Sequence, residues 1–223
     1  MATASFTTVL PQGALCEYVT RQLNTFFPDG DAGRAVRFVM ADALARMEHC
    51  MRHVRMKAWW AAEGPRFNHL HTDQYAVFLY YLSNAAHRRG ETPLAAKAYA
   101  LNKALHGLDA FYEVELPAIF AVVHPVGTVL GRATYGDYFC AYQNVTVGAD
   151  LDDTHPTLGS GVVLYGGARV IGASRVGDNC FINGGCALYG DTVPDGHNAF
   201  GQHPAVTTKP AKRNVVRDIF RDA

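Results

Sequence analysis

Residues 158–193 read LGSGVV-LYGGAR-VIGASR-VGDNCF-INGGCA-LYGDTV, which is one six-residue pattern repeated six times. An aliphatic residue opens every unit, and the fifth place is always small or slender. The opening residues are Leu158, Leu164, Val170, Val176, Ile182 and Leu188, and the fifth residues are Val162, Ala168, Ser174, Cys180, Cys186 and Thr192. A unit of six residues is too short for a strand and a helix, and it suits a short strand plus a corner. The stretch therefore predicts a left-handed parallel β-helix, with the opening residues stacked inside.

The same spacing of six continues upstream of this stretch. It runs through Val123, Val129, Tyr135, Ala141 and Val147, which predicts that the repeat begins near residue 120, or a little earlier at 113–117. The sequence GADLDDTHP at 148–156 interrupts the pattern. Three units make one coil of a three-sided column, so we expect roughly four coils with a loop at one corner. Insertions of this kind usually serve function or assembly.

The front of the chain has the periodicity of helices instead. Apolar residues recur every three or four positions from Val36 to Val54 and predict a helix over about 31–62, which Gly64 and Pro65 would end. Thr72 is expected to be the N-cap of a second helix, and a third is expected over 93–106, before Gly107. The fold is therefore expected to be α+β. A helical domain at 1–110 precedes a β-helix domain at 111–205 and a basic tail at 206–223.

The composition limits the partners. Lys plus Arg and Asp plus Glu both number 20 in 223 residues, which argues against a nucleic-acid or membrane surface as the main partner. The chain lacks an apolar run of membrane-spanning length and a signal peptide, so we expect a soluble, cytoplasmic protein. Its five cysteines include Cys180 and Cys186 at inner places of the repeat, which predicts buried free thiols rather than a disulfide or metal site.

Two histidines stand out because of where they fall in the repeat. His124 lies at its entrance and His155 ends its interrupting loop, and a proline follows each. A neutral imidazole can act as a general base near physiological pH. Either histidine could also be an ordinary corner residue, but their placement favours a functional role.

Three segments around these histidines resemble the bacterial serine O-acetyltransferase family of hexapeptide acyltransferases. They are VHPVGTVLGRA at 123–133, YQNVTVG at 142–148 and THPTLGSGVVLYGGARVIG at 154–172. The resemblance covers about 110–205 well and the helices only in outline. It implies transfer of an acetyl group from acetyl-CoA to a hydroxyl, with His124 as the base and His155 holding the acceptor. The spacing around His124 is one residue short of the family's, and His124-Pro125 could instead match the His-Pro of the preceding family coil. The first register is preferred because the segments on both sides then line up. The resemblance also implies an acid that orients the base, for which Glu115 is preferred over Glu113 and Asp109.

The resemblance implies a homotrimer, with a dimer of trimers left open, in which acetyl-CoA lies in a groove between neighbouring columns. It suggests that small residues of the later coils let the pantetheine arm of acetyl-CoA approach the backbone. It also suggests that basic residues of the tail contact the phosphates of CoA. These residues are Gly166, Gly167, Gly184, Gly185, Ala187, Lys209, Lys212 and Arg213. Corner geometry alone could equally explain the glycines, and a solvated terminus the basic residues. No metal cofactor is expected.

Two departures from the family pattern bear on the acceptor. The family has an acidic residue before the base and an arginine before the second histidine, where this chain has Val123 and Thr154. Because those charges recognise the amino and carboxylate groups of serine in the family, a sugar or polysaccharide precursor is an alternative acceptor. A non-catalytic scaffold is a further alternative. A γ-class carbonic anhydrase would need three zinc-binding histidines, and the sequence offers no convincing third.

Overall fold

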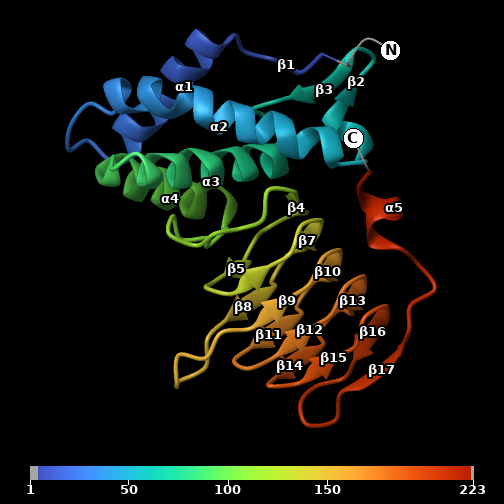
Figure 1. Cartoon of the computed structure of the whole chain (residues 1–223). Helices are drawn as coiled ribbons and strands as arrows, with labels where there is room; N and C mark the ends of the chain where they lie inside the picture. Colours follow the sequence, from blue (N-terminus) through green and yellow to red (C-terminus); the bar gives the residue numbers. More distant parts are fainter. Residues whose placement is uncertain (1–4, 222–223) are drawn as a thin grey trace.

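A layer of helices sits on one end of a three-sided column of strands (Figure 1). The structure is a computed structural model that describes residues 5–221. Residues 1–4 of the predicted helical domain and residues 222–223 of the predicted basic tail lie outside the described part. The helices of the layer are α1 (Gln12–Phe26), α2 (Gly33–His53), α3 (Thr72–Arg88) and α4 (Thr92–His106). The expected α+β class is confirmed.

Helix α3 is the centre of the helical layer and also closes the end of the column. Every residue from 73 to 86 is buried, as expected for a helix that is covered on all sides. Helices α2 and α4 cover it laterally. The rings of Tyr80 and Tyr81 each lie 5.5 Å from the ring of Phe120, the first residue of the first strand of the column. The two parts of the chain therefore share one hydrophobic core.

The boundaries of the helices differ in part from the sequence predictions. The third helix is confirmed, and Gly107 ends it with a left-handed φ of 65°. Thr72 is the first residue of α3 rather than its N-cap. The predicted helix over 31–62 is wrong after His53, and α1 was not predicted.

The segment after α2 leaves the helical path because Val54 is extended, and its carbonyl accepts a hydrogen bond from the Trp60 indole at 2.7 Å. A short 3-10 helix (Lys57–Trp59) follows, and then a small sheet packs beside α2. The strands of this sheet are β1 (Thr7–Thr8), β2 (Trp60–Ala61) and β3 (Gly64–Phe67). Aromatic residues in this segment continue the apolar composition of α2 without its helical spacing.

The column is a parallel β-helix with three sheets, which confirms the predicted fold. Sheet I contains β4 (Phe120–Val122), β7 (Phe139–Ala141), β10 (Val162–Leu164), β13 (Cys180–Ile182), β16 (His197–Phe200) and the antiparallel β17 (Thr207–Pro210). Sheet II contains β5 (Val129–Leu130), β8 (Thr146–Gly148), β11 (Arg169–Ile171) and β14 (Ala187–Tyr189). Sheet III contains β6 (Thr134–Tyr135), β9 (Thr157–Leu158), β12 (Arg175–Val176) and β15 (Thr192–Val193). Successive triplets from β4 to β15 make four coils, as expected.

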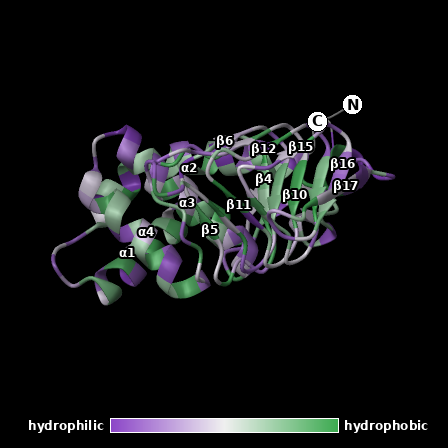
Figure 2. Cartoon of the chain, turned by 90° about the horizontal axis from the view of Figure 1, so that it is seen from below, coloured by the Kyte–Doolittle hydropathy of each residue, from purple (hydrophilic) through white to green (hydrophobic). Residues whose placement is uncertain are grey.

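The inside of the column is the predicted aliphatic ladder. The six residues that open the units of 158–193 are at most 3% exposed. Figure 2 shows hydrophobic residues along β4 and β10 of sheet I. The fifth-place residues are also buried, except Thr192, which is exposed because β15 comes one residue early and Val193 takes the inner place above Val176.

In the first coil the predicted register is wrong. Leu130 and not Val129 pairs with Val147 on the inside, and Val129 is 37% exposed. Likewise Val122 and not Val123 pairs with Ala141. Two changes of spacing cause this. The inner residues Leu130 and Tyr135 are five positions apart, whereas Val170 and Val176 of a later coil are six apart. The corner between β4 and β5 then contains six residues (123–128), whereas the corner between β7 and β8 contains four (142–145). Counting in sixes back from the later coils therefore fails first between β6 and β5, at Val129, and again at the corner between β5 and β4, at Val123.

The end of the chain runs back along the column to the helical layer (Figure 1). We call residues 211–221 the C-terminal strap. It contains α5 (Val215–Ile219), and Val215 and Phe220 are fully buried. Phe220 forms an antiparallel bridge with Val54 at the end of α2. The strap thus joins the two ends of the molecule. The predicted domain boundaries stay a prediction.

Candidate active site

His124 occupies the enlarged corner between β4 and β5 and is exposed on the surface of the single chain. Its backbone has a φ of 50°, a left-handed conformation that is rare for residues other than glycine. The backbone N–H of His124 donates a hydrogen bond to the carboxylate of Asp73 at 3.2 Å. The next residue, Pro125, is buried, and its carbonyl accepts the N–H of Thr128 at 3.0 Å. The corner is therefore fixed from both sides.

The sequence did not single out Asp73, although it lies in the first turn of α3 and is only 6% exposed. A buried carboxylate needs hydrogen-bond donors, and the N–H of His124 is one of them. The signal available in the sequence was an acid directly after Thr72 in an otherwise apolar helix. That pattern is common at helix N-termini and carries no specific functional meaning.

The predicted CoA-binding glycines share an edge of the column with His124. We call this edge, where sheet I turns into sheet II, the I–II edge. It contains the corner of His124, then Gly166 and Gly167 between β10 and β11, and Gly184 and Gly185 between β13 and β14. The structure therefore aligns the predicted base and all four glycines along one line.

Corner geometry accounts for most of these glycines. Gly167 and Gly185 have φ values of 75° and 70°, which other residues rarely adopt. A Cβ atom at Gly166 would lie 2.9 Å from the side-chain nitrogen of Gln143, and one at Gly184 would lie 3.3 Å from the carbonyl of Gly166. A Cβ atom at Gly185 would meet nothing within 4 Å, so the surface beside this corner is open.

The remaining predicted CoA contacts divide between two edges. Ala187 is the first residue of β14 and lies next to the I–II edge, where it bridges to Gln202. Lys209 lies on β17, paired with Asn198. Lys212 and Arg213 lie elsewhere, beside the edge where sheet III turns into sheet I. There, the Asn179 side chain donates to the Arg213 carbonyl at 3.2 Å.

The structure thus does not bring Lys212 and Arg213 to the predicted glycines. A hydrogen bond from Arg213 to Asp218 at 2.9 Å raises the pKa of the Arg213 guanidinium. Its charge is therefore already offset by a neighbour in the strap.

His155 lies at the third edge, between sheets II and III, near the end of the loop between β8 and β9. Its side chain is 35% exposed, and its Nε2 atom is 3.5 Å from the carboxylate of Asp153. The loop is organised by Asp150, whose carboxylate accepts the N–H groups of Asp152 and Thr154 at 3.0 and 2.9 Å. Because His124 and His155 occupy different edges of the column, the fold does not bring them together within one chain.

Three acids were candidates for orienting the base, and the structure separates them. The preferred residue, Glu115, pairs with Arg88 and accepts a hydrogen bond from Asn84 at 3.3 Å. These two partners lie in the last turns of α3, about 20 Å along the helix from Asp73 and the His124 corner. Glu113 pairs with Arg132 at 3.0 Å. The structure therefore does not place Glu115 beside His124.

Asp109 is the acid that lies on the same edge as His124. It forms a parallel bridge with Val129, directly after the His124 corner, and exchanges backbone hydrogen bonds of 2.8 Å with Thr128 and Leu130. Its carboxylate accepts hydrogen bonds from Tyr99 at 2.7 Å and Lys103 at 2.6 Å. Burial raises the pKa of Asp109, but these two partners together outweigh it and hold that pKa below its usual value. Asp109 is therefore a carboxylate at neutral pH.

All five cysteines are buried free thiols, as predicted for Cys180 and Cys186. Cys140 is fully buried in β7. Burial raises the pKa of the Cys140 thiol to about 12, which makes it a poor nucleophile. Within residues 5–221, no group of three histidine, cysteine or acidic side chains could hold a metal ion, and no helix is long and apolar enough to span a membrane.

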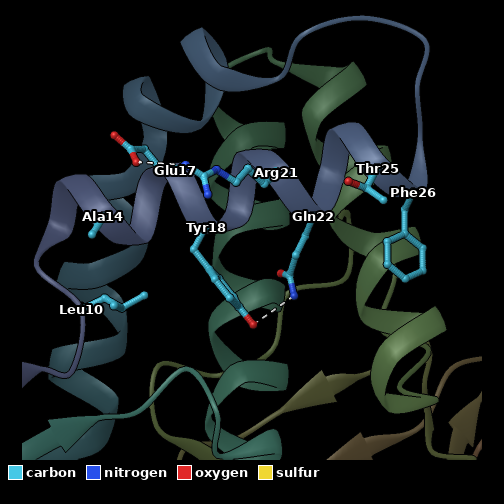
Figure 3. A pocket seen from close by; sticks show the side chains of 8 residues that line it. All are labelled: Leu10, Ala14, Glu17, Tyr18, Arg21, Gln22, Thr25 and Phe26. Carbon is cyan, nitrogen blue, oxygen red and sulfur yellow. Dashed lines mark hydrogen bonds and ion pairs between the residues drawn. The ribbon is translucent and has the colours of Figure 1, made fainter.

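A hollow of about 510 Å³ lies along α1, and neither His124 nor His155 lines it. Figure 3 shows its lining, in which Tyr18 and Gln22 are joined by a hydrogen bond and Glu17 and Arg21 by an ion pair. All eight lining residues lie within 10–26, on or just before α1, and none is a predicted site residue. We therefore assign it no part in the site at the I–II edge.

Comparison with known proteins identifies the family. No family model matches the chain. The serine acetyltransferase of Helicobacter pylori (strain ATCC 700392 / 26695) is 31% identical over 139 residues, which is 60% of this chain and 81% of the relative. The chain belongs to the serine acetyltransferase family. The serine acetyltransferase of Synechococcus elongatus is 33% identical over 99 residues, or 43% of this chain and 41% of that protein.

Solved structures of serine acetyltransferases share the fold. That of Brucella abortus strain S19 has a TM-score of 0.70 at 16% identity, over 92% of this chain and 85% of that one. A serine acetyltransferase in complex with CoA has a TM-score of 0.69 at 16% identity, over 89% of this chain and 84% of that one. The resemblance stated from the sequence is thereby confirmed, and it extends to the helical layer.

Proposed function

We propose that this serine acetyltransferase family member transfers an acetyl group from acetyl-CoA to the hydroxyl of L-serine, forming O-acetylserine and free CoA. The imidazole of His124 takes the proton of the hydroxyl as its oxygen attacks the thioester carbonyl. The tetrahedral intermediate then collapses, the C–S bond breaks, and the proton passes from the imidazolium to the leaving thiolate. The family membership and the CoA complex of a structural neighbour support this assignment.

The observation that carries the proposal is the enlarged corner of His124. It is the corner with six residues where the next three coils have four, and it presents an exposed imidazole from a backbone that Asp73 holds in place. The lower corners of the I–II edge have asparagine or glycine at their left-handed positions, which are Asn144, Gly167 and Gly185. His124 therefore occupies a conformation that favours presentation of its ring over local stability.

Asp109 is the best candidate for the residue that orients the base. It lies on the I–II edge above Val129, whereas Glu115 is engaged at the far end of α3. Asp109 remains ionised, and a carboxylate near an imidazole fixes its tautomer and stabilises the imidazolium that forms during transfer. In this proposal the acid that orients the base is Asp109 and not Glu115.

The proposed working unit is a homotrimer. His124 and His155 lie on opposite borders of sheet II, so they can meet only if the I–II edge of one chain faces the II–III edge of a neighbour. A groove between two columns would then contain His124 from one chain and His155 from the next. Acetyl-CoA would extend along the I–II edge past Gly166, Gly167, Gly184, Gly185 and Ala187, with Lys209 near its far end. We place the enzyme in the cytoplasm.

A neutral acceptor is the second candidate. Val123 precedes the base and is half-buried, and Thr154 precedes His155 in an exposed loop. Neither residue carries a charge that could form an ion pair with the amino or carboxylate group of a free amino acid. A sugar hydroxyl requires no such charges, so these two positions favour a sugar or polysaccharide precursor over serine.

The test is release of free thiol from acetyl-CoA in the presence of L-serine or a panel of sugars. The wild type should turn over one of these acceptors, and His124→Ala should lose at least about a hundredfold in kcat. The matched control is His49→Ala, which removes an exposed histidine from α2. Full activity of His124→Ala would refute the assignment of the base. A protein that neither binds nor hydrolyses acetyl-CoA would instead support a scaffold.

A further inference from the structure

Three arginines converge where the C-terminal strap meets the helical layer, far from the I–II edge. Arg55 follows α2, and Arg217 and Arg221 belong to the strap. They line a hollow of about 360 Å³ together with Asn214, Val216 and Phe220. This hollow combines backbone from two distant parts of the chain with three guanidinium groups.

The backbone fixes the spacing of these arginines. The N–H of Arg55 donates to the carbonyl of Ile219 at 2.9 Å, and the N–H of Arg221 donates to the carbonyl of His53 at 2.8 Å. The side chain of Arg55 reaches across to the carbonyl of Arg217 at 2.5 Å. The positive groups are therefore held together by structure, although they repel one another.

The charges in this cluster are not balanced within the part of the chain that the structure describes. Asp218 pairs with Arg217 at 3.4 Å and more closely with Arg213. Over residues 5–221, neither Arg55 nor Arg221 forms an ion pair, and the buried Nε atom of Arg221 has no hydrogen-bond partner. Burial, followed by the charge of Arg55, lowers the pKa of Arg221.

Arg221 is also immobilised. Its guanidinium carbon lies 3.3 Å from the centre of the Trp60 ring, and the Trp60 indole is itself fixed by the Val54 carbonyl. Stacking of this kind leaves the edge of the guanidinium available for in-plane hydrogen bonds. An immobilised guanidinium with a buried, unsatisfied donor is well suited to bind an oxyanion, because little side-chain entropy is lost on binding.

We propose that Arg55, Arg217 and Arg221 form a binding site for a phosphate-type oxyanion, which locks the C-terminal strap onto the end of α2. A dianion matches the two positive charges that lack an acidic partner. The ligand would contact α2 through Arg55 and the strap through the other two residues. The site is separate from acetyl-CoA, since the proposed groove lies on a different edge of the column.

The experiment is a titration of the full chain with inorganic phosphate, compared with sodium chloride at equal ionic strength. Calorimetry should show saturable binding of one phosphate per chain, and the melting temperature should rise with the same saturation. Hydrogen exchange at 213–221 should slow on binding. Saturating CoA should not displace the phosphate. Displacement by CoA, or no saturable binding, would overturn the proposal.

The variants are Arg55→Gln and Arg221→Gln, each expected to weaken phosphate binding about tenfold or more, since each removes a charge-assisted hydrogen bond. Arg55→Lys keeps the positive charge and should therefore retain part of the affinity for phosphate. It also shows whether the chain folds with a substitution at this position. Arg21→Gln, in exposed α1, is the matched control and should bind as the wild type does. Wild-type affinity in both glutamine variants would refute the site.

The sequence offers one internal source of the same chemistry, the carboxylate of Asp222, which lies outside the described residues. Asp222→Asn separates the two sources. The proposal predicts phosphate affinity within about twofold of the wild type, since the ligand comes from solution. Binding that appears only in Asp222→Asn would assign the arginines to Asp222 and overturn the proposal.

Discussion

The carboxylate of Asp73 in α3 accepts the backbone N–H of His124 at 3.2 Å, so the helical layer holds the corner of the β-helix that carries the proposed base. The two residues are 51 positions apart in sequence. This contact makes the position of the imidazole depend on how α3 is seated on the end of the column. Asp73 is a positioning residue, since it acts on the backbone of His124.

Asp73→Ala is therefore expected to lower kcat by about tenfold, because the left-handed conformation of His124 loses its acceptor. The KM for acetyl-CoA should change less than about twofold, since the glycine corners are not affected. Asp73→Asn keeps a side-chain oxygen and should restore most of the activity. Steady-state kinetics of the two variants, with melting temperatures for both, provide the check. Equal losses in both would show that the charge, and not the hydrogen bond, is needed.

The assignment of the orienting acid makes a second prediction. Asp109→Asn should lower kcat/KM by about a hundredfold, because an amide does not stabilise the imidazolium. Glu115→Gln should retain activity within about threefold, since it weakens an exposed pair with Arg88 and keeps a side-chain oxygen that can accept from Asn84. The pH–rate profile distinguishes a direct role from a structural one, because a direct role should change the shape of the profile, whereas a structural loss should lower the rate by the same factor at every pH. A larger loss in Glu115→Gln would restore the acid preferred from the sequence.

Close stacking of the coils predicts a difference between two glycines. A Cβ atom at Gly136 would lie 2.5 Å from the backbone of Gly159, whereas one at Gly148 would meet nothing within 4 Å. Gly136→Ala is expected to lower the free energy of unfolding by about 1–3 kcal/mol, because backbone of the next coil must move. Gly148→Ala should change it by less than about 0.5 kcal/mol. Urea unfolding of both variants measures the difference, and similar values would refute close packing at Gly136.

His106 predicts how stability depends on pH. Burial in α4 lowers its pKa to about 4, below the ordinary value of 6.5. Between these values the unfolded chain binds a proton that the folded chain does not. The contribution of the neutral, buried His106 to the free energy of unfolding is therefore fully present above pH 6.5 and is lost as pH falls towards 4. His106→Gln should reduce the slope of melting temperature against pH in this window. An unchanged slope would mean that other groups cause it.

The repeat in 158–193 was sufficient to predict the column, because six aliphatic residues in register leave no other way to bury them together. The same counting failed in the first coil, where Val123 and Val129 proved not to point inward. The spacing of the later coils cannot predict a corner of different length in the first coil. Helix α1 was also missed, although Leu15, Cys16, Val19 and Leu23 have helical spacing and are buried.

Of the proposed site, His124 and the corner glycines could be predicted from the sequence, since they follow from the repeat and the family segments, and their roles stay predictions. The sequence did not identify Asp73, because its contact with His124 depends on how α3 meets the column. The choice of Glu115 over Asp109 rested on the similarity of a short segment. The structure instead shows which acid shares an edge with the base. Lys212 and Arg213 were grouped with the glycines through the family resemblance, but the strap places them at another edge.

The six-residue corner of His124 bulges from the column without disturbing the ladder beneath it, since Leu130 and Val147 pair as regularly as residues of the lower coils. Loop length at this point is thus decoupled from the hydrophobic interior. Relatives could lengthen, shorten or recharge this bulge and so change which alcohol they accept, while the scaffold that binds the thioester stays the same.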